Sequence, residues 1–106
     1  MTLSEMQRIF CLNIAKLITW TYEQGLELTF GESYNMSGTG HMKNSNHYIR
    51  LAQDLNLFKE STYISVSDDY KSLGKYWKSL NPLNRWGGDF KSKDGNHFSM
   101  LWKGRA

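Results

Sequence analysis

The N-terminal part of the chain carries its apolar residues at the spacing of an α-helix. Between Leu3 and Tyr22 these residues fall on one face: Leu3, Met6, Phe10, Ile14, Leu17 and Ile18, widened by Ile9 and Cys11. Thr2 or Ser4 can cap the start of such a helix, and Gly25 can end it. The pattern therefore predicts one long amphipathic helix whose apolar face packs against a core.

Alternation of apolar and polar residues then predicts strands. Residues 26–34 (LELTFGESY) alternate as a strand with one buried face does, and Gly31 within them indicates a bulge or the close approach of another backbone. Residues 62–66 and 97–102 are also typical of short strands.

Helical spacing returns at residues 68–80 despite Gly74, and Asn81-Pro82 ends it. Residues 35–44 read as a surface loop, and residues 86–90 and 94–96 as turns. A strand-rich centre flanked by two helices predicts an α+β fold.

Composition limits the size and class of the protein. With 106 residues, 40% of them hydrophobic, and one proline, the chain fits one domain over residues 1–106. The net charge of +3 comes from scattered lysines and arginines, which does not favour a nucleic-acid partner. Cys11 is the only cysteine, so an internal disulfide and a four-cysteine zinc site are excluded. Its place in an apolar helical run predicts a buried thiol.

The sequence shows neither the pattern of a signal peptide nor that of a membrane-spanning helix. The first residues lack the basic region of a signal peptide, and Asn13 and Lys16 interrupt the apolar run before about 20 apolar residues accumulate. We therefore expect a protein that starts in the cytoplasm and has no stable membrane association.

His47 and Asp54 stand seven residues apart in an otherwise apolar segment, residues 45–58. An ionised carboxylate among leucines is costly unless a positive group meets it. Both residues can be satisfied locally, His47 by a backbone carbonyl and Asp54 by a turn or by Arg50. In one regular strand an odd spacing points the two side chains to opposite faces, so convergence requires a helix, or a strand with a bend near His47.

A second cluster lies near the C-terminus. Asp94 precedes His97 by three residues, and Gly95-Asn96 can fold the two side chains together. A set of two histidines and one aspartate suits a catalytic zinc ion whose fourth position is left to water. The alternative for Asp94 is a turn-forming residue before glycine. Asp89 is a competing carboxylate, although its place after two glycines suits a turn equally well. His41 in the loop is an exposed residue or a substrate contact.

Four segments in order resemble one enzyme family. Ser45-Asn46-His47 followed by Asp54 resembles the Ser-x-His-(x)6-Asp signature of zinc D-Ala-D-Ala carboxypeptidases and L-alanyl-D-glutamate peptidases, a family that includes phage endolysins. Residues 86–90 (WGGDF) and 94–98 (DGNHF) are similar to its closing motif, and residues 28–34 (LTFGESY) to the strand before its active-site loop. The resemblance spans residues 26–100.

The resemblance implies a Zn²⁺ ion held by His47, Asp54 and His97, with Asp94 as the catalytic acid and base. Ser45 would be a partner that orients a ligand. The implied fold is a small antiparallel sheet with flanking helices, a Hedgehog/DD-peptidase-like single domain. The segment after His47 would then be a strand entered through a loop.

One position departs from the family pattern. Many members carry an arginine after the GESY segment, where this chain has Asn35, and an amide brings no full charge to the reaction. Arg50 and Lys43 are candidates to replace that charge.

The implied activity is hydrolysis of a peptide bond in the peptidoglycan stem, most simply by an L-alanyl-D-glutamate endopeptidase that acts as a phage or prophage endolysin. Such an enzyme is expected to be a monomer, to accumulate in the host cytoplasm, and to reach the cell wall in the periplasm after the membrane is permeabilised. The alternatives are a D-alanyl-D-alanine carboxypeptidase and a non-catalytic cell-wall-binding protein on the same fold.

Overall fold

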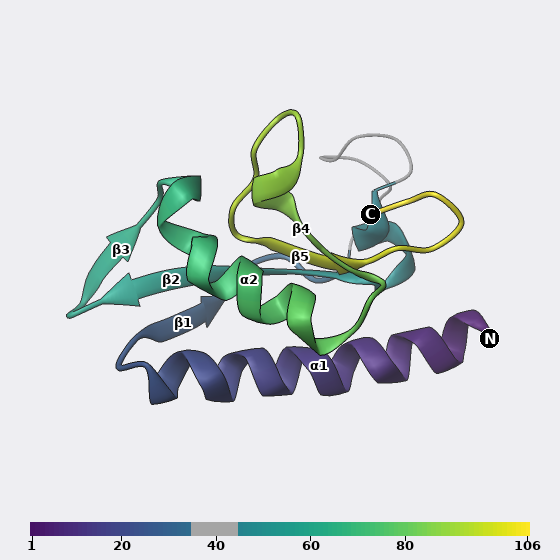
Figure 1. Cartoon of the computed structure of the whole chain (residues 1–106), viewed down its shortest axis with the longest axis horizontal. Coiled ribbons are helices and arrows are strands. Elements are labelled where there is room, and N and C mark those ends of the chain that lie inside the picture. The colour runs from purple at the N-terminus through teal and green to yellow at the C-terminus, as the bar shows by residue number, and fades with distance from the viewer. Residues whose placement is uncertain (35–44) are drawn as a thin grey trace.

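The computed structural model describes residues 1–34 and 45–106. In this part of the chain the helices and strands follow in the order α1 (Leu3–Glu23), β1 (Glu27–Phe30), β2 (Ala52–Lys59), β3 (Thr62–Ile64), α2 (Lys71–Leu80), β4 (Asn84–Trp86) and β5 (His97–Met100). Three short 3-10 turns lie between them: η1 (Asn46–Ile49), η2 (Ser67–Tyr70) and η3 (Gly87–Asp89). Figure 1 shows α1 running along one side of the molecule, with α2 between it and the 87–97 segment.

The strands form one antiparallel sheet in the order β1-β2-β5-β4, and β3 also pairs with β2. β2 is the central strand and the longest at 8 residues. Its first half pairs with β5, where Asp54 lies opposite His97, and its second half pairs with β1 and β3. The α+β fold with an antiparallel sheet and flanking helices is therefore confirmed.

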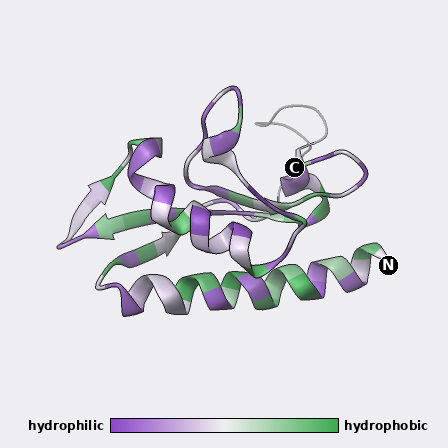
Figure 2. Ribbon diagram, viewed as in Figure 1, coloured by the Kyte–Doolittle hydropathy of each residue, from purple (hydrophilic) through white to green (hydrophobic). Residues whose placement is uncertain are grey.

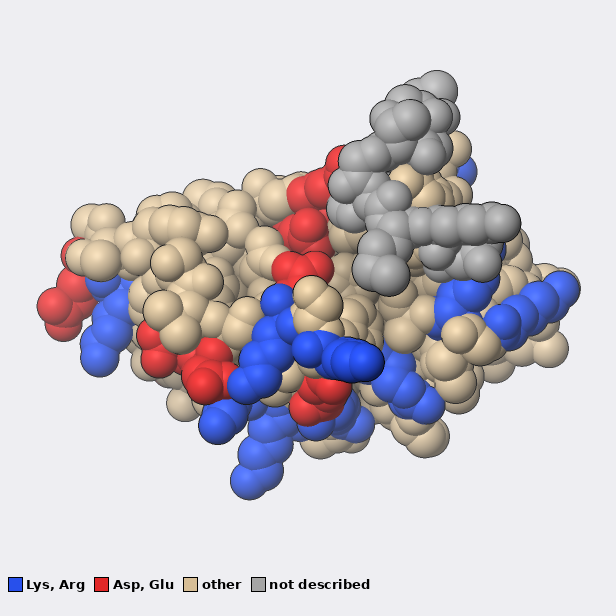
Figure 3. Space-filling view, turned by 90° about the horizontal axis from the view of Figure 1, so that it is seen from above, with Lys and Arg blue, Asp and Glu red and all other residues tan. Residues whose placement is uncertain are grey.

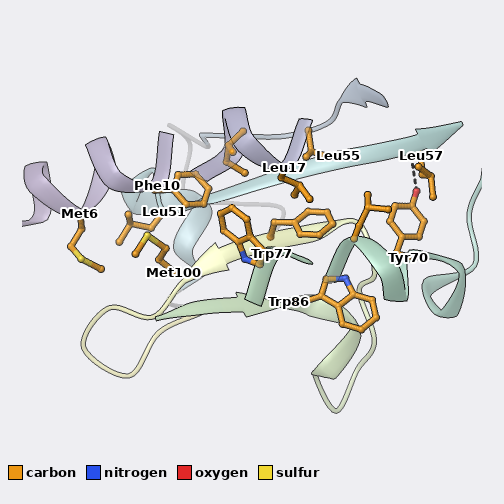
Figure 4. Packing of buried hydrophobic residues seen from close by; sticks show 13 residues of the cluster. Met6, Phe10, Leu17, Leu51, Leu55, Leu57, Tyr70, Trp77, Trp86 and Met100 are labelled. Atoms are coloured by element: carbon orange, nitrogen blue, oxygen red, sulfur yellow. Dashed lines mark hydrogen bonds between the residues drawn. The ribbon is translucent and has the colours of Figure 1, made fainter. Parts of the chain in front are cut away.

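Both helices contribute to one hydrophobic core. Trp77 of α2 is fully buried and makes an edge-to-face ring contact with Phe10 of α1 (Figure 4). It makes a second such contact with Phe98 of β5. Leu55 and Leu57 of β2 join the same cluster. Because side chains alternate along a strand, His97 points to the face of the sheet opposite Phe98, away from this core.

The first helix has nearly the predicted extent. Thr2 is its N-cap in a capping box with Glu5, and Gly25 follows its end with φ of +79°. Figure 2 shows apolar and polar residues alternating along its turns, as an amphipathic helix requires. The prediction of a buried Cys11 was wrong, because Cys11 lies on the solvent side of the helix beside the exposed Leu12.

The predicted strands and second helix are present but shorter. The strand predicted over residues 26–34 ends at Phe30, and the helix predicted from Asp68 begins at Lys71 after the η2 turn. β4 was not predicted, since residues 86–90 were interpreted as a turn only. Among the described residues, no helix is long and apolar enough to cross a membrane.

Candidate metal centre

His47 lies in η1, a single 3-10 turn that leads into β2. The Ser45 hydroxyl accepts a hydrogen bond from the His47 N–H at 3.3 Å, which caps the turn. Arg50 ends the turn in the left-handed conformation with φ of 56°. This bend separates His47 from the regular strand, so its side chain reaches the same side as Asp54 despite the odd spacing between them.

Asn46 fixes the η1 turn to the C-terminal segment. Its fully buried side-chain amide donates to the Met100 carbonyl at 2.6 Å and to the Arg105 carbonyl at 3.0 Å. In return, the Arg105 guanidinium donates to the Ser45 carbonyl at 3.1 Å. Sequence reasoning did not identify Asn46 or Arg105 as supports of the site. In the sequence, only the position of Asn46 directly before His47 could have suggested that Asn46 supports the site.

Asp54 and His97 face each other across neighbouring strands. They are directly paired in the β2–β5 ladder, which places both side chains on the same face of the sheet. Gly31 packs against Asp54 from the other side: its N–H donates to the Asp54 carbonyl at 2.8 Å, and a Cβ on Gly31 would lie 2.9 Å from the Asp54 Cβ. The close backbone approach predicted from Gly31 is therefore confirmed.

The structure brings His47, Asp54 and His97 together. The Asp54 Oδ1 atom lies 3.1 Å from His47 Nε2 and 3.5 Å from His97 Nδ1, and the two ring nitrogens are 3.3 Å apart. Tetrahedral zinc with nitrogen and oxygen ligands at about 2.0–2.1 Å requires ligand atoms about 3.3 Å apart. The three residues thus fit three corners of a zinc site, and no other described group of three such side chains does so.

The ring of His47 is oriented by the main chain. Its Nδ1 lies 3.2 Å from the Ser33 carbonyl, and a carbonyl can only accept, so Nδ1 carries the proton. Nε2 is left facing Asp54, with a lone pair available to a metal ion in the neutral ring. His97 turns Nδ1 toward the same point, and its Nε2 is buried without a hydrogen-bond partner among the described residues.

The three side chains are electrostatically coupled. Burial disfavours the charged form of His47, but the hydrogen bond and charge of Asp54 outweigh burial and raise the pKa of His47. Burial also works against ionised Asp54, yet the hydrogen bonds from His47 and His97 lower the pKa of Asp54. An ionised carboxylate between two imidazoles attracts positive charge, and a bound metal ion would displace protons from the rings.

Asp94 stands at the rim of this group. Its Oδ2 atom is 4.0 Å from His97 Nδ1, and its side chain is 54% exposed. The Asp94 N–H donates to the Gly87 carbonyl at 2.9 Å, and a Cβ on Gly87 would lie 2.0 Å from the Asp94 carbonyl oxygen. Glycine at position 87 is therefore what permits the turn that carries Asp94 toward His97.

The other predicted residues have different surroundings. The Arg50 guanidinium stacks on the Tyr34 ring, 4.0 Å from its centroid. Asp89, considered as a competing carboxylate, instead pairs with Lys78 at 2.6 Å. The predictions for Asn35, His41 and Lys43 lie outside the described residues.

Charged side chains are unevenly distributed over the face of the molecule seen in Figure 3. In Figure 3, which looks onto the upper side of Figure 1, acidic side chains form a row in the middle of the face. Lysines and arginines lie mainly toward one edge and one end of the same face.

Comparison with known proteins agrees with this geometry. The family model described as D-alanyl-D-alanine carboxypeptidase matches residues 39–100, more than half of the chain. A similar solved structure is the L-Ala D-Glu endopeptidase ChiX of Serratia marcescens, with a TM-score of 0.69 and 17% sequence identity over 92% of this chain and 85% of that chain. No curated protein matches the chain. The chain belongs to the D-alanyl-D-alanine carboxypeptidase family of peptidases.

Proposed function

We propose that the protein is a zinc-dependent peptidoglycan peptidase that hydrolyses the L-alanyl-D-glutamate bond of the stem peptide. The observation that carries this proposal is the spacing of the three ligand atoms, 3.1, 3.3 and 3.5 Å, on His47, Asp54 and His97. The choice of bond is supported by the structural similarity to an L-Ala D-Glu endopeptidase.

The protein's own side chains have separate roles in this proposal. His47 Nε2, Asp54 Oδ1 and His97 Nδ1 hold the zinc ion, and Ser33 and Ser45 orient His47. When bound, zinc activates water and polarises the scissile carbonyl. Asp94 takes a proton from the attacking water and delivers it to the leaving amine, for which its exposed position beside His97 is suited.

The biological setting we propose is that of a phage or prophage endolysin. The protein accumulates in the host cytoplasm, acts as a monomer, and cleaves the wall in the periplasm once the membrane has been permeabilised.

The proposal is tested on purified peptidoglycan with the zinc-loaded protein and three variants. His47→Ala should lose both zinc and cleavage, because it removes a ligand. Asp94→Ala should keep zinc and lose cleavage. Asp89→Ala removes a carboxylate that pairs with Lys78 instead, so it should keep both. Zinc content and the masses of the released fragments are measured, and equal cleavage by all four proteins would refute the assignment.

A D-alanyl-D-alanine carboxypeptidase is the second candidate, favoured by the description of the matching family. The same experiment separates the two activities, because a carboxypeptidase releases free D-alanine whereas an endopeptidase cuts inside the stem. A non-catalytic wall-binding protein is a third alternative, because Asn35 stands where many family members have an arginine. Such a protein would bind zinc and release no fragment.

A further inference from the structure

The position of Asp94 is set by its main chain. Among residues 1–34 and 45–106, no group hydrogen-bonds its carboxylate, which lies 4.0 Å from His97 Nδ1. Its N–H donates to the Gly87 carbonyl at 2.9 Å, and its carbonyl accepts from the His97 N–H at 3.0 Å. The direction of the carboxylate therefore depends on how firmly the backbone at this point is held.

The next residue, Gly95, is held by two side chains. Its N–H donates to the Ser67 hydroxyl at 2.9 Å, and its carbonyl accepts from the indole N–H of Trp86 at 2.7 Å. Gly95 is buried, and a Cβ on it would lie 2.5 Å from the Ser67 Cα. The peptide after Asp94 is thus clamped against the η2 turn on one side and the Trp86 ring on the other.

Ser67 differs from the other partners of this segment. Gly87, Trp86 and His97 belong to the closing motif itself, whereas Ser67 comes 28 residues before Gly95. It is the first residue of η2, and no side chain caps that turn. Its hydroxyl accepts a hydrogen bond from the Gly95 N–H, and the nitrogen of that group is bonded to the carbonyl carbon of Asp94.

We propose that Ser67 is a positioning residue for Asp94, which it aligns by fixing the Asp94–Gly95 peptide. The inference rests on the proposed function, in which Asp94 transfers the proton. Without the Ser67 oxygen the Gly95 N–H has no acceptor, so the peptide can rotate and carry the carboxylate away from the attacking water. Misplacement of about 1 Å is enough to lower a rate by about 100-fold.

The test compares Ser67→Ala with the wild-type protein on a soluble stem peptide that contains the L-Ala–D-Glu bond, with zinc bound. We expect kcat to fall by about 10- to 100-fold, with KM and the zinc dissociation constant changed less than about twofold. Ser72→Ala is the matched control, because Ser72 is exposed on α2 and should leave all three values unchanged.

A purely structural role would change these values differently. If Ser67 only stabilised the fold, zinc affinity and kcat would fall together, or the melting temperature would drop with kcat unchanged, and either result overturns the inference. Where Ser67→Ala does not fold, Ser67→Cys replaces it, since a thiol keeps the volume but is a weak acceptor, and the same criteria apply. If the wild-type protein binds zinc but cleaves nothing, both the proposed function and the role of Ser67 are overturned. If the wild-type protein cleaves the peptide and Ser67→Ala keeps the full kcat, only the role of Ser67 is overturned.

Discussion

Tyr70 is a buried polar residue whose hydroxyl joins two segments. It accepts a hydrogen bond from the Leu57 N–H at 2.9 Å and donates to the Ile64 carbonyl at 2.7 Å, as Figure 4 shows for Leu57. The residue is 1% exposed, and burial raises the pKa of the phenol. The Tyr70 hydroxyl thus provides the acceptor for the Leu57 N–H of β2, which is buried away from water.

Tyr70→Phe should lower the free energy of unfolding by about 1–3 kcal/mol at neutral pH, because it leaves the buried Leu57 N–H without an acceptor. The difference between wild type and variant should shrink as pH rises. A folded-state pKa above the unfolded value of about 10 means that the contribution is complete below pH 10 and is lost as pH rises through the folded-state pKa. Denaturant titrations between pH 7 and 11 measure both effects.

Tyr63→Phe is the matched control for Tyr70. Tyr63 is 53% exposed, so its loss of a hydroxyl should change the free energy of unfolding by less than about 0.5 kcal/mol. If the two variants had the same stability, the hydrogen bonds of Tyr70 would not matter to the fold.

Side chains that meet in the site were easier to predict than the groups that orient them. His47, Asp54 and His97 carry distinctive chemistry, and the resemblance to a known family indicated that they would meet. Ser33 acts through its carbonyl, which every residue possesses, so no sequence signal marks it. Asn46 acts through contacts with residues more than 50 positions away, which only the folded chain brings near.

At the scale of elements, α2 and β4 are joined by the contact between Gly74 and Trp86. A Cβ on Gly74 would lie 2.3 Å from the indole ring, and one on Gly88 would lie 2.1 Å from the same ring. The ring is thus enclosed between two glycines, and its N–H reaches Gly95 in the segment that carries Asp94. A glycine that looked unfavourable for a helix is required by packing.

Gly74→Ala should destabilise the protein, although the same change in an exposed helix would stabilise it by about 1 kcal/mol. The added methyl group cannot fit unless the rigid indole moves, and such overpacking costs about 1–3 kcal/mol. Because a displaced Trp86 also disturbs Gly95, kcat should fall as well. Thermal unfolding and peptide cleavage measure the two consequences.

Ser72→Ala separates packing from helix propensity. Ser72 lies two residues before Gly74 in α2 and is exposed, so alanine should leave stability equal or slightly higher. If Gly74→Ala stabilised the protein, α2 and β4 would have to be far enough apart to accept a methyl group beside the Trp86 ring.

Elements were predictable where a pattern repeats. The long run of helical spacing predicted α1 to within one residue of its end, since Leu3–Glu23 gives the pattern 21 residues in which to recur. β4 has only 3 residues, too few for alternation to show, and it exists because Asn84 to Trp86 pair with β5. The strand over residues 26–34 was predicted too long, because its regular pairing ends at Phe30. Beyond it, Gly31 and Glu32 both hydrogen-bond the single residue Asp54, which is the pairing of a bulge.

At the scale of the whole molecule, the helices and the candidate metal site lie on opposite faces of the sheet. The core under α1 and α2 holds the sheet together, while His47, Asp54 and His97 come from the η1 turn, β2 and β5. A metal ion bound there would link three segments that are distant in the sequence, in addition to any catalytic role. Its binding energy would then add to the stability of the fold.

Zinc should therefore raise the melting temperature of the wild-type protein. A ligand at about 100 times its dissociation constant adds about 2.7 kcal/mol to the free energy of unfolding, which corresponds to about 10 °C for a domain of this size. Asp94→Ala should show the same increase, because Asp94 lies outside the ligand triangle. His97→Ala should show almost none, since one corner of the site is missing. Calorimetry with and without zinc, at fixed protein concentration, gives the shift without any substrate.

The thermal shift distinguishes a metal site from a hydrogen-bonded cluster that merely resembles one. Without metal, a protonated His47 donates its Nε2–H to Asp54 at 3.1 Å, and this hydrogen bond contributes to stability on its own. A cluster built only for those bonds would gain nothing from zinc, and wild type and His97→Ala would then respond alike. A shift in wild type and Asp94→Ala that is absent from His97→Ala would show that zinc binds at this cluster and that His97 is one of its ligands, because the hydrogen bonds of the cluster alone give no response to zinc.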